Sequence, residues 1–120
     1  MYTYSFEKLE VWQNARDLAK QIYIVTKSYP EEEKFGLINQ MRRAVISISS
    51  NIAEGSGRTS SKDYAHFIQI AYGSLLELLN QLILSVDLEY ISDSSYLDLR
   101  ANVEEISNKL NSLRTYLLGK

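Results

Sequence analysis

The segment Ser49–Ser60, SSNIAEGSGRTS, has the composition that most suggests ligand chemistry. A phosphate-binding P-loop also combines glycines with a cation, but it follows a strand and has GxxxxGK[ST] spacing, so that backbone N–H groups and a lysine converge on the phosphates. Gly55 and Gly57 lack that spacing and follow a helical pattern. We therefore interpret the segment as a turn in which these glycines take the left-handed conformation that ends a helix. Arg58 and Lys62, beside the expected start of the next helix, are a candidate anion site.

Few residues are available for catalysis or metal binding. The chain has no cysteine, which excludes disulfides, thiol nucleophiles and thiolate metal sites. Its one histidine, His66, is not part of a Glu-x-x-His pair, two of which a carboxylate-bridged metal site in a helical bundle requires. No nucleophile and orienting acid accompany it at triad spacing, so we interpret His66 as a solvated side chain. The sequence predicts neither an enzyme nor a cofactor, metal or small-molecule substrate.

The composition predicts one soluble domain. A chain of 120 residues suffices for a single core, so we treat residues 1–120 as one domain. The first residues, MYTYSFEKLE, lack the basic region and apolar stretch of a signal peptide, and Glu77, Asn80 and Gln81 interrupt the most apolar segment. We therefore expect a cytoplasmic protein without a membrane span. The net charge of −2 gives no general attraction to nucleic acid or anionic lipid.

Apolar residues recur at intervals of three and four along four segments, which is typical of one face of a helix. Sustained alternation of apolar and polar residues, the pattern of a strand, is absent from the sequence. The short breaks between the segments favour antiparallel neighbours. We therefore predict an all-α fold, an antiparallel up-down-up-down four-helix bundle. The four apolar stripes are Val11–Tyr29, Leu37–Ile52, Tyr64–Val86 and Leu99–Leu117.

Residues with preferences for helix ends mark the breaks between these segments. Pro30 suits a first helical position, and the three glutamates that follow it favour the positive end of a helix dipole. They predict the start of the second helix or a short lead-in to it. Ser60 or Ser61 is the expected N-cap of the third helix, and the serines of the Ile91–Ser95 segment are candidates for the fourth.

Uncharged polar residues interrupt the apolar parts of the second and third helices. Asn51, Ser74 and Gln81 stand among large apolar residues, as expected for groups that hydrogen-bond between helices. Gly73 is expected to let a neighbouring backbone approach closely. A solvated polar face gives the same pattern and stays open as an alternative. The residues assigned to contacts between helices or between subunits are Asn51, Glu54, Ser74 and Glu77.

The third helix carries more apolar surface than one core requires. Besides its main stripe it has a second apolar row, which the helical repeat turns by about 100° from the first. A helix with a free outer face needs only one stripe, so we expect the second row to form an interface between copies of the chain. The row consists of Tyr72, Leu76, Leu79 and Ile83.

Two motifs give the chain a likeness to a known family. Asn-Ile-Ala-Glu-Gly at residues 51–55 and Gly-Ser-x-x-Glu at residues 73–77 resemble the bacterial four-helix-bundle proteins named after 23S rRNA intervening sequences. The resemblance covers nearly the whole chain. It implies a small cytoplasmic bundle that assembles into a ring, commonly a homopentamer, without cofactor or metal. It also implies kinship with the accessory protein of diversity-generating retroelements, which resembles a basic barrel that binds nucleic acid and a reverse transcriptase.

These observations lead to two hypotheses for the function. The first is a non-enzymatic homo-oligomeric scaffold or adaptor, in the form of a pentameric ring by the resemblance. The alternative is RNA or DNA binding through a basic rim repeated around the ring, where repetition multiplies weak contacts by avidity. The chain is mildly acidic, with a pI of about 5.4, and has few cations for such contacts. The candidate rim residues are Arg42, Arg43, Arg58 and Lys62.

Overall fold

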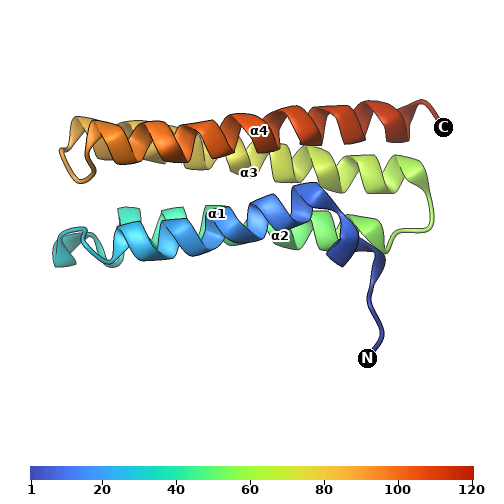
Figure 1. The fold of residues 1–120 in the computed structure, drawn as a ribbon, viewed down its shortest axis with the longest axis horizontal. Helices are drawn as coiled ribbons and strands as arrows, with labels where there is room; N and C mark the ends of the chain where they lie inside the picture. The colour runs from blue at the N-terminus through green and yellow to red at the C-terminus, as the bar shows by residue number, and fades with distance from the viewer.

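The structure, a computed structural model of all 120 residues, contains four long helices and no strand. Each long helix runs opposite to the one before it, and the four lie along one another as a bundle (Figure 1). The predicted all-α four-helix fold is therefore confirmed. The long helices are α1 at Glu10–Thr26, α2 at Leu37–Ser56, α3 at Ser61–Asp87 and α4 at Asp93–Leu118. Two short 3-10 helices precede α1 and α2, namely η1 at Ser5–Lys8 and η2 at Glu31–Glu33.

The four apolar stripes meet in one core of 22 buried residues. Helix α2 packs against α1 and α3, while α4 packs against α3 and α1. Leu18, Ile48, Leu75 and Ile106, one from each helix, are completely excluded from solvent. Each such side chain contributes on the order of 1.5–3 kcal/mol when buried, so the stripes together hold the bundle closed.

The predicted serine caps are confirmed at the starts of α3 and α4. The Ser60 hydroxyl accepts a hydrogen bond from the Asp63 backbone N–H at 3.1 Å, and Ser92 accepts one from Ser95 at 3.1 Å. Such bonds satisfy one of the backbone donors that a helix start leaves unpaired. Pro30 precedes the short lead-in η2, and α2 itself begins only at Leu37.

The conformation predicted for the glycines of the Ser49–Ser60 segment is wrong. No glycine in the chain has a positive φ, and Gly57 ends α2 at φ −90°. Gly55 lies inside α2 and is buried. A Cβ atom there would lie 2.8 Å from the Cβ of Phe67 and 3.1 Å from a ring carbon of Tyr64. Gly55 therefore serves the close approach of α2 to α3, while the residues after it turn the corner between these helices.

Side chains from distant parts of the sequence fasten one end of the bundle. The loops α1–α2 and α3–α4 meet there, and the Tyr90 hydroxyl donates a hydrogen bond of 2.9 Å to Oε2 of Glu33. The other oxygen of Glu33 accepts the Leu37 backbone N–H at 3.2 Å, so it also caps α2. Tyr29 is buried beside Tyr90, with their ring centroids 5.3 Å apart. We refer to this end as the latched end, and to the opposite end, which carries both termini (Figure 1), as the open end.

Helix α3 is long and apolar enough to match a membrane-spanning helix by length and composition alone. Only 33% of its most apolar 18-residue window is buried inside the bundle. The interruptions at Glu77, Asn80 and Gln81 therefore do not remove that match, and much apolar side-chain surface of α3 faces outward. The candidate site lies on this outward surface.

Candidate functional site

The outer side of α3 carries an apolar row along its border with α4. Gln69, Leu76 and Ile83 are spaced by seven residues and so share one face of the helix. Gln69 accepts a 2.6 Å hydrogen bond from Arg114, which places this face beside α4. Leu76 and Ile83 remain 47% and 40% exposed. The predicted row is therefore only partly covered, because its other two members, Tyr72 and Leu79, are half-buried against the core.

A second exposed apolar row follows the border of α3 with α2. Ile70 and Leu84 are exposed and lie seven positions to either side of Glu77. Ile46 on α2 is exposed as well. Sequence reasoning missed these three residues, although the seven-residue interval from Ile70 to Glu77 and from Glu77 to Leu84 is visible in the sequence. Both flanks of α3 therefore present apolar side chains to solvent, and we call the two flanks together the α3 surface.

A small polar notch interrupts the α2 flank of this surface. Arg43, Ser47, Ser74 and Glu77 line it. The Ser47 and Ser74 hydroxyls hydrogen-bond to each other at 2.8 Å and so join α2 to α3 directly. Asn51 donates to the Ser47 hydroxyl at 3.0 Å and to its carbonyl at 2.8 Å, which keeps Ser47 in position. Arg43 and Glu77, the two charged residues of the notch, form no ion pair within the protomer.

Of the predicted polar contacts between helices, only that of Ser74 is confirmed within the protomer. The prediction is wrong for Asn51, which bonds only within α2, and the remaining polar candidates do not bridge helices either. Glu54 pairs with Arg58 at 3.1 Å on the outside of the bundle. Gln81 donates to Glu77 along α3 at 3.4 Å, and although the residue is only 3% exposed, its carbonyl oxygen has no partner. The expectation that Gly73 lets another backbone approach is wrong for the protomer. A Cβ added there would meet no atom within 4 Å, because this position of α3 faces solvent.

The four basic candidates fall into separate places rather than one rim. Arg42 faces α1, where it donates to the Thr26 hydroxyl at 3.0 Å and to the Tyr23 carbonyl at 3.3 Å, and its guanidinium lies 4.6 Å from the centre of the Tyr23 ring. Arg43 lines the notch towards α3 instead, because one residue turns an α-helix by about 100°. Sequence adjacency therefore does not give these two arginines a common surface.

Arg58 and Lys62 lie at the open end, away from the other pair. Arg43 and Arg58 are separated by 58 − 43 = 15 residues of α2 and its C-terminal end. At the helical rise this is about 22 Å. The Arg58 guanidinium lies over the Phe67 ring, 4.3 Å from its centre, and pairs with Glu54, while Lys62 is exposed in the first turn of α3.

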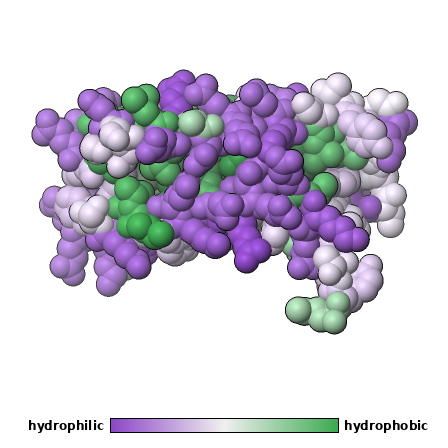
Figure 2. All heavy atoms as spheres, viewed as in Figure 1, coloured by the Kyte–Doolittle hydropathy of each residue, from purple (hydrophilic) through white to green (hydrophobic).

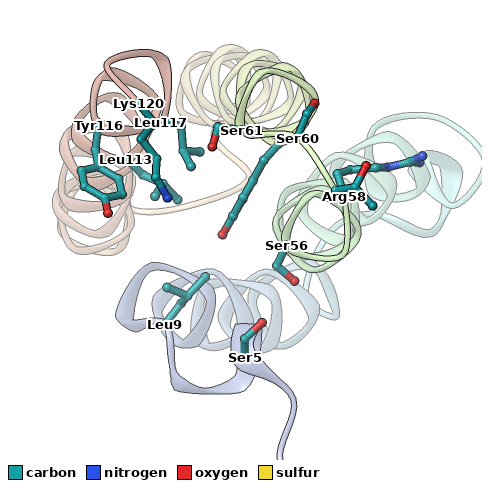
Figure 3. Close-up of a pocket in the computed structure, with 12 residues that line it drawn as sticks. Ser5, Leu9, Ser56, Arg58, Ser60, Ser61, Leu113, Tyr116, Leu117 and Lys120 are labelled. Atoms are coloured by element: carbon teal, nitrogen blue, oxygen red, sulfur yellow. The ribbon is translucent and has the colours of Figure 1, made fainter.

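A cavity of about 420 Å³ opens between the helix ends at the open end (Figure 3). Leu9, Leu113 and Leu117 supply an apolar part of its wall. Arg58 belongs to the lining, but its guanidinium extends away from the cavity (Figure 3). The Ser49–Ser60 segment thus contributes hydroxyl groups to the cavity, while the positive charge of Arg58 lies outside it. The hydroxyl-bearing residues of the lining are Ser5, Ser56, Thr59, Ser60, Ser61, Tyr64 and Tyr116.

The face formed by α1 and α4 is mainly hydrophilic (Figure 2), in contrast to the α3 surface. Lys109 of α4 is its central cation and donates hydrogen bonds to Glu10 and Asn14 of α1 and to Glu105 of its own helix. These bonds to two carboxylates favour the charged ammonium, which raises the pKa of Lys109 above its usual value. Lys109 thus links α1 to α4 across this face.

Comparison with known proteins identifies the family of this chain. The sequence pattern of the 23S rRNA-intervening sequence proteins matches residues 7–112 of the chain. The chain belongs to this family. No curated protein matches it.

A solved structure supports the fold of this 23S rRNA-intervening sequence family member. A protein of unknown function from the S23 ribosomal protein family of Bacteroides thetaiotaomicron is similar to it, with 27% sequence identity and a TM-score of 0.80. The similarity covers 87% of this chain and 97% of that chain. The family match ends at residue 112 and begins at residue 7, so the first residues of the chain and the last turns of α4 lie outside it.

Proposed function

We propose that this member of the 23S rRNA-intervening sequence family is a non-enzymatic homo-oligomeric scaffold whose subunits meet through the α3 surface. One observation carries the proposal: Leu76 and Ile83 are exposed on one flank of α3, while Ile70 and Leu84 are exposed on the other. A contiguous apolar surface on a folded protein is typical of an interaction site. Covering these side chains in an oligomer removes their apolar area from water, which stabilises the assembly.

The two flanks differ, and this difference favours a ring. The α4 flank is purely apolar at Leu76 and Ile83, whereas the α2 flank contains the notch with Arg43 and Glu77. Two unlike surfaces that bind each other give a heterologous contact, which forms a closed ring when the rotation per subunit divides a full turn. A pentamer is the ring size that the family resemblance implies. The open space beside Gly73 supports close contact of a neighbouring subunit at the centre of the α3 surface.

The alternative function, RNA or DNA binding through Arg42, Arg43, Arg58 and Lys62, has less support. Arg42 is engaged with Thr26 and Tyr23, and Arg58 is engaged with Glu54 and Phe67. Binding to a polyanion depends on several cations that release counterions from adjacent phosphates. In a ring, the remaining cations recur once per subunit, so avidity is the main source of affinity for this alternative.

The native mass of the purified protein tests the proposal. Light scattering is expected to give a discrete oligomer from micromolar to millimolar concentration, with the ultraviolet absorbance of protein free of nucleic acid. The double substitution Leu76→Ser and Ile83→Ser is expected to give a folded monomer. The matched control, Ile24→Ser with Leu97→Ser, removes two exposed apolar side chains elsewhere and is expected to leave the mass unchanged.

Two outcomes would contradict the proposal. A monomeric native protein across the whole concentration range rejects the scaffold. Co-purified nucleic acid, or a mobility shift that weakens steeply as salt is added, favours the alternative, since release of counterions makes such binding salt-dependent.

A further inference from the structure

The first four residues form an arm that no part of the protomer covers. Tyr2 and Tyr4 are 75% and 61% exposed, and their rings contact each other edge to face with centroids 4.9 Å apart. The arm extends sideways from the open end (Figure 1) and protrudes below the hydrophilic face as a pale to green projection (Figure 2). Two exposed aromatic rings side by side, held away from the core, are a surface suited to a partner rather than to solvent.

The base of the arm is fixed, so its direction is set by the fold. The Tyr4 backbone N–H donates to Oε2 of Glu7 at 2.8 Å, which closes the first turn of η1. Phe6 packs edge to face on Trp12, with ring centroids 5.0 Å apart, and the Arg16 guanidinium lies over the Trp12 ring, 5.5 Å from its centre. These contacts hold the chain at Phe6 and let only the residues before Ser5 project.

The open-end cavity has the chemistry that a tyrosine side chain requires. A buried tyrosine ring needs an apolar surrounding, and its hydroxyl needs a hydrogen-bonding partner. The cavity offers Leu9, Leu113 and Leu117 for the ring and seven hydroxyl-bearing residues for the phenol. Its volume of about 420 Å³ lies at the lower end of the usual range for sites that bind small organic groups.

The arm does not enter the cavity of its own subunit. Ser5 lines this cavity, but the chain before it leads away from the opening (Figure 3), and neither Tyr2 nor Tyr4 is part of the lining. In a ring with cyclic symmetry all open-end cavities lie at the same height along the ring axis. Because the arm starts at the same end as the cavity, a neighbour's cavity lies near the level of the arm. The three residues before the anchored Tyr4 reach about 10 Å when extended, which is about the distance between the axes of two packed helices.

We propose that the arm of each subunit docks in the open-end cavity of a neighbouring subunit, with the Tyr2 ring between the leucines and its hydroxyl among the serines. This inference rests on the proposed homo-oligomer. It assigns a partner to the cavity, namely a second copy of this chain, and it links the subunits at a place separate from the α3 surface. The arm and the Leu113–Lys120 part of the cavity wall lie outside residues 7–112, the range of the family match, whereas the rest of the lining except Ser5 lies within it.

Disulfide trapping tests the inference, and the absence of native cysteine makes the test clean. Two full-length single variants are made, Thr3→Cys in the arm, which keeps both tyrosines, and Thr59→Cys at the cavity. Both positions are exposed in the protomer, so neither substitution disturbs the core. The variants are mixed, allowed to exchange subunits and oxidised. We expect a covalent dimer that contains one copy of each variant. The control mixture, Ile24→Cys with Thr59→Cys, is expected to give none.

Three results would overturn the docking. In a chain that carries both Thr3→Cys and Thr59→Cys, a disulfide within one chain and none in the mixture would assign the arm to its own cavity. An intact oligomer without a disulfide in either preparation would reject docking and leave the scaffold standing. A native protein that is monomeric at all concentrations would reject both proposals together, which separates the two kinds of failure.

The contribution of the arm to assembly is measured by dilution. The double substitution Tyr2→Ser and Tyr4→Ser is expected to raise the concentration at which half of the oligomer dissociates by about tenfold or more, the factor given by loss of one favourable buried group per contact. The control, Ile24→Ser with Leu97→Ser, is expected to leave this concentration unchanged. Equal dissociation of the arm variant and the native protein would overturn the inference.

Discussion

The two ends of the bundle are built in different ways. At the latched end, Glu33 binds both Tyr90 and the start of α2, and Thr26 binds Arg42, so polar contacts join four segments. At the open end, no hydrogen bond crosses the cavity between the helices that line it. Hydrogen bonds between distant segments therefore join the latched end, although the buried Tyr29 hydroxyl there has no partner, whereas no such bond joins the segments around the open-end cavity.

The largest expected effect tests how loose the open end is. Gly55→Ala puts a methyl group 2.8 Å from the Cβ of Phe67, so we expect it to lower the free energy of unfolding by about 1–3 kcal/mol despite the better helix propensity of alanine. The control, Ser50→Ala on the exposed side of α2, adds no atom and is expected to change this free energy by less than about 0.5 kcal/mol. Urea unfolding measures both. A neutral Gly55→Ala would mean that α2 and α3 can separate near the cavity.

The next effect tests the latched end. Thr26→Val keeps the shape of the buried side chain but removes the acceptor of the Arg42 Nε hydrogen bond at 3.0 Å. A lost hydrogen bond that leaves a donor unpaired costs about 1–2 kcal/mol. We therefore expect urea unfolding to show a free energy of unfolding lower by about this amount. Thr115→Val at the exposed end of α4 is the control, expected to stay within about 0.5 kcal/mol. Equal effects of the two substitutions would remove the distinction between the ends.

A smaller effect is expected for the tyrosine that joins the two loops. Tyr90→Phe removes the 2.9 Å hydrogen bond to Glu33, and we expect the thermal midpoint to fall by roughly 3 °C. Tyr116→Phe at the open end, where the hydroxyl has no protein partner, is the control and should leave the midpoint unchanged. Differential scanning calorimetry provides the measurement, and a midpoint unchanged by Tyr90→Phe would show that the latch contributes nothing.

Alkaline pH should weaken both ends gradually. Burial raises the pKa of Tyr29 and Tyr64 above the usual 10.0, and the hydrogen bond to Glu33 raises that of Tyr90. The fold therefore favours the neutral phenols, so their contribution is fully present below pH 10 and is lost as pH rises through the raised values. The tyrosines should therefore leave the thermal unfolding midpoint unchanged from about pH 8 to 10 and lower it above pH 10. Ultraviolet titration should find three of the nine tyrosines ionising late.

The sequence predicts the helices and their starts better than it predicts which neighbour each residue meets. Periodicity and capping preferences are local properties, so the four stripes, Ser60 and Ser92 are all recovered. Gly55 was wrong as a helix terminator because its role depends on Phe67, which the fold brings against it from another helix. Gly73 was wrong for a related reason, since nothing local reveals which side of α3 faces solvent.

The candidate site was predicted only in part. The row with Leu76 and Ile83 is visible as surplus apolar spacing, but the second row with Ile46 on α2 requires knowledge of the α2–α3 border. Arg42 and Arg43 are adjacent in sequence and yet face different helices. Successive residues of an α-helix point about 100° apart, so neighbours in the sequence do not share a surface. The open-end cavity joins residues from both ends of the chain and has no local signal.

Trp12 is the only tryptophan of the chain and lies between Phe6, where the arm begins, and Arg16. Indole emission responds to the polarity and quenching groups around the ring. The chain therefore contains a natural fluorescent reporter at the root of its arm. If the arm docks on a neighbouring subunit as proposed, a shift in this single emission band is expected to report the docking in real time, without a label.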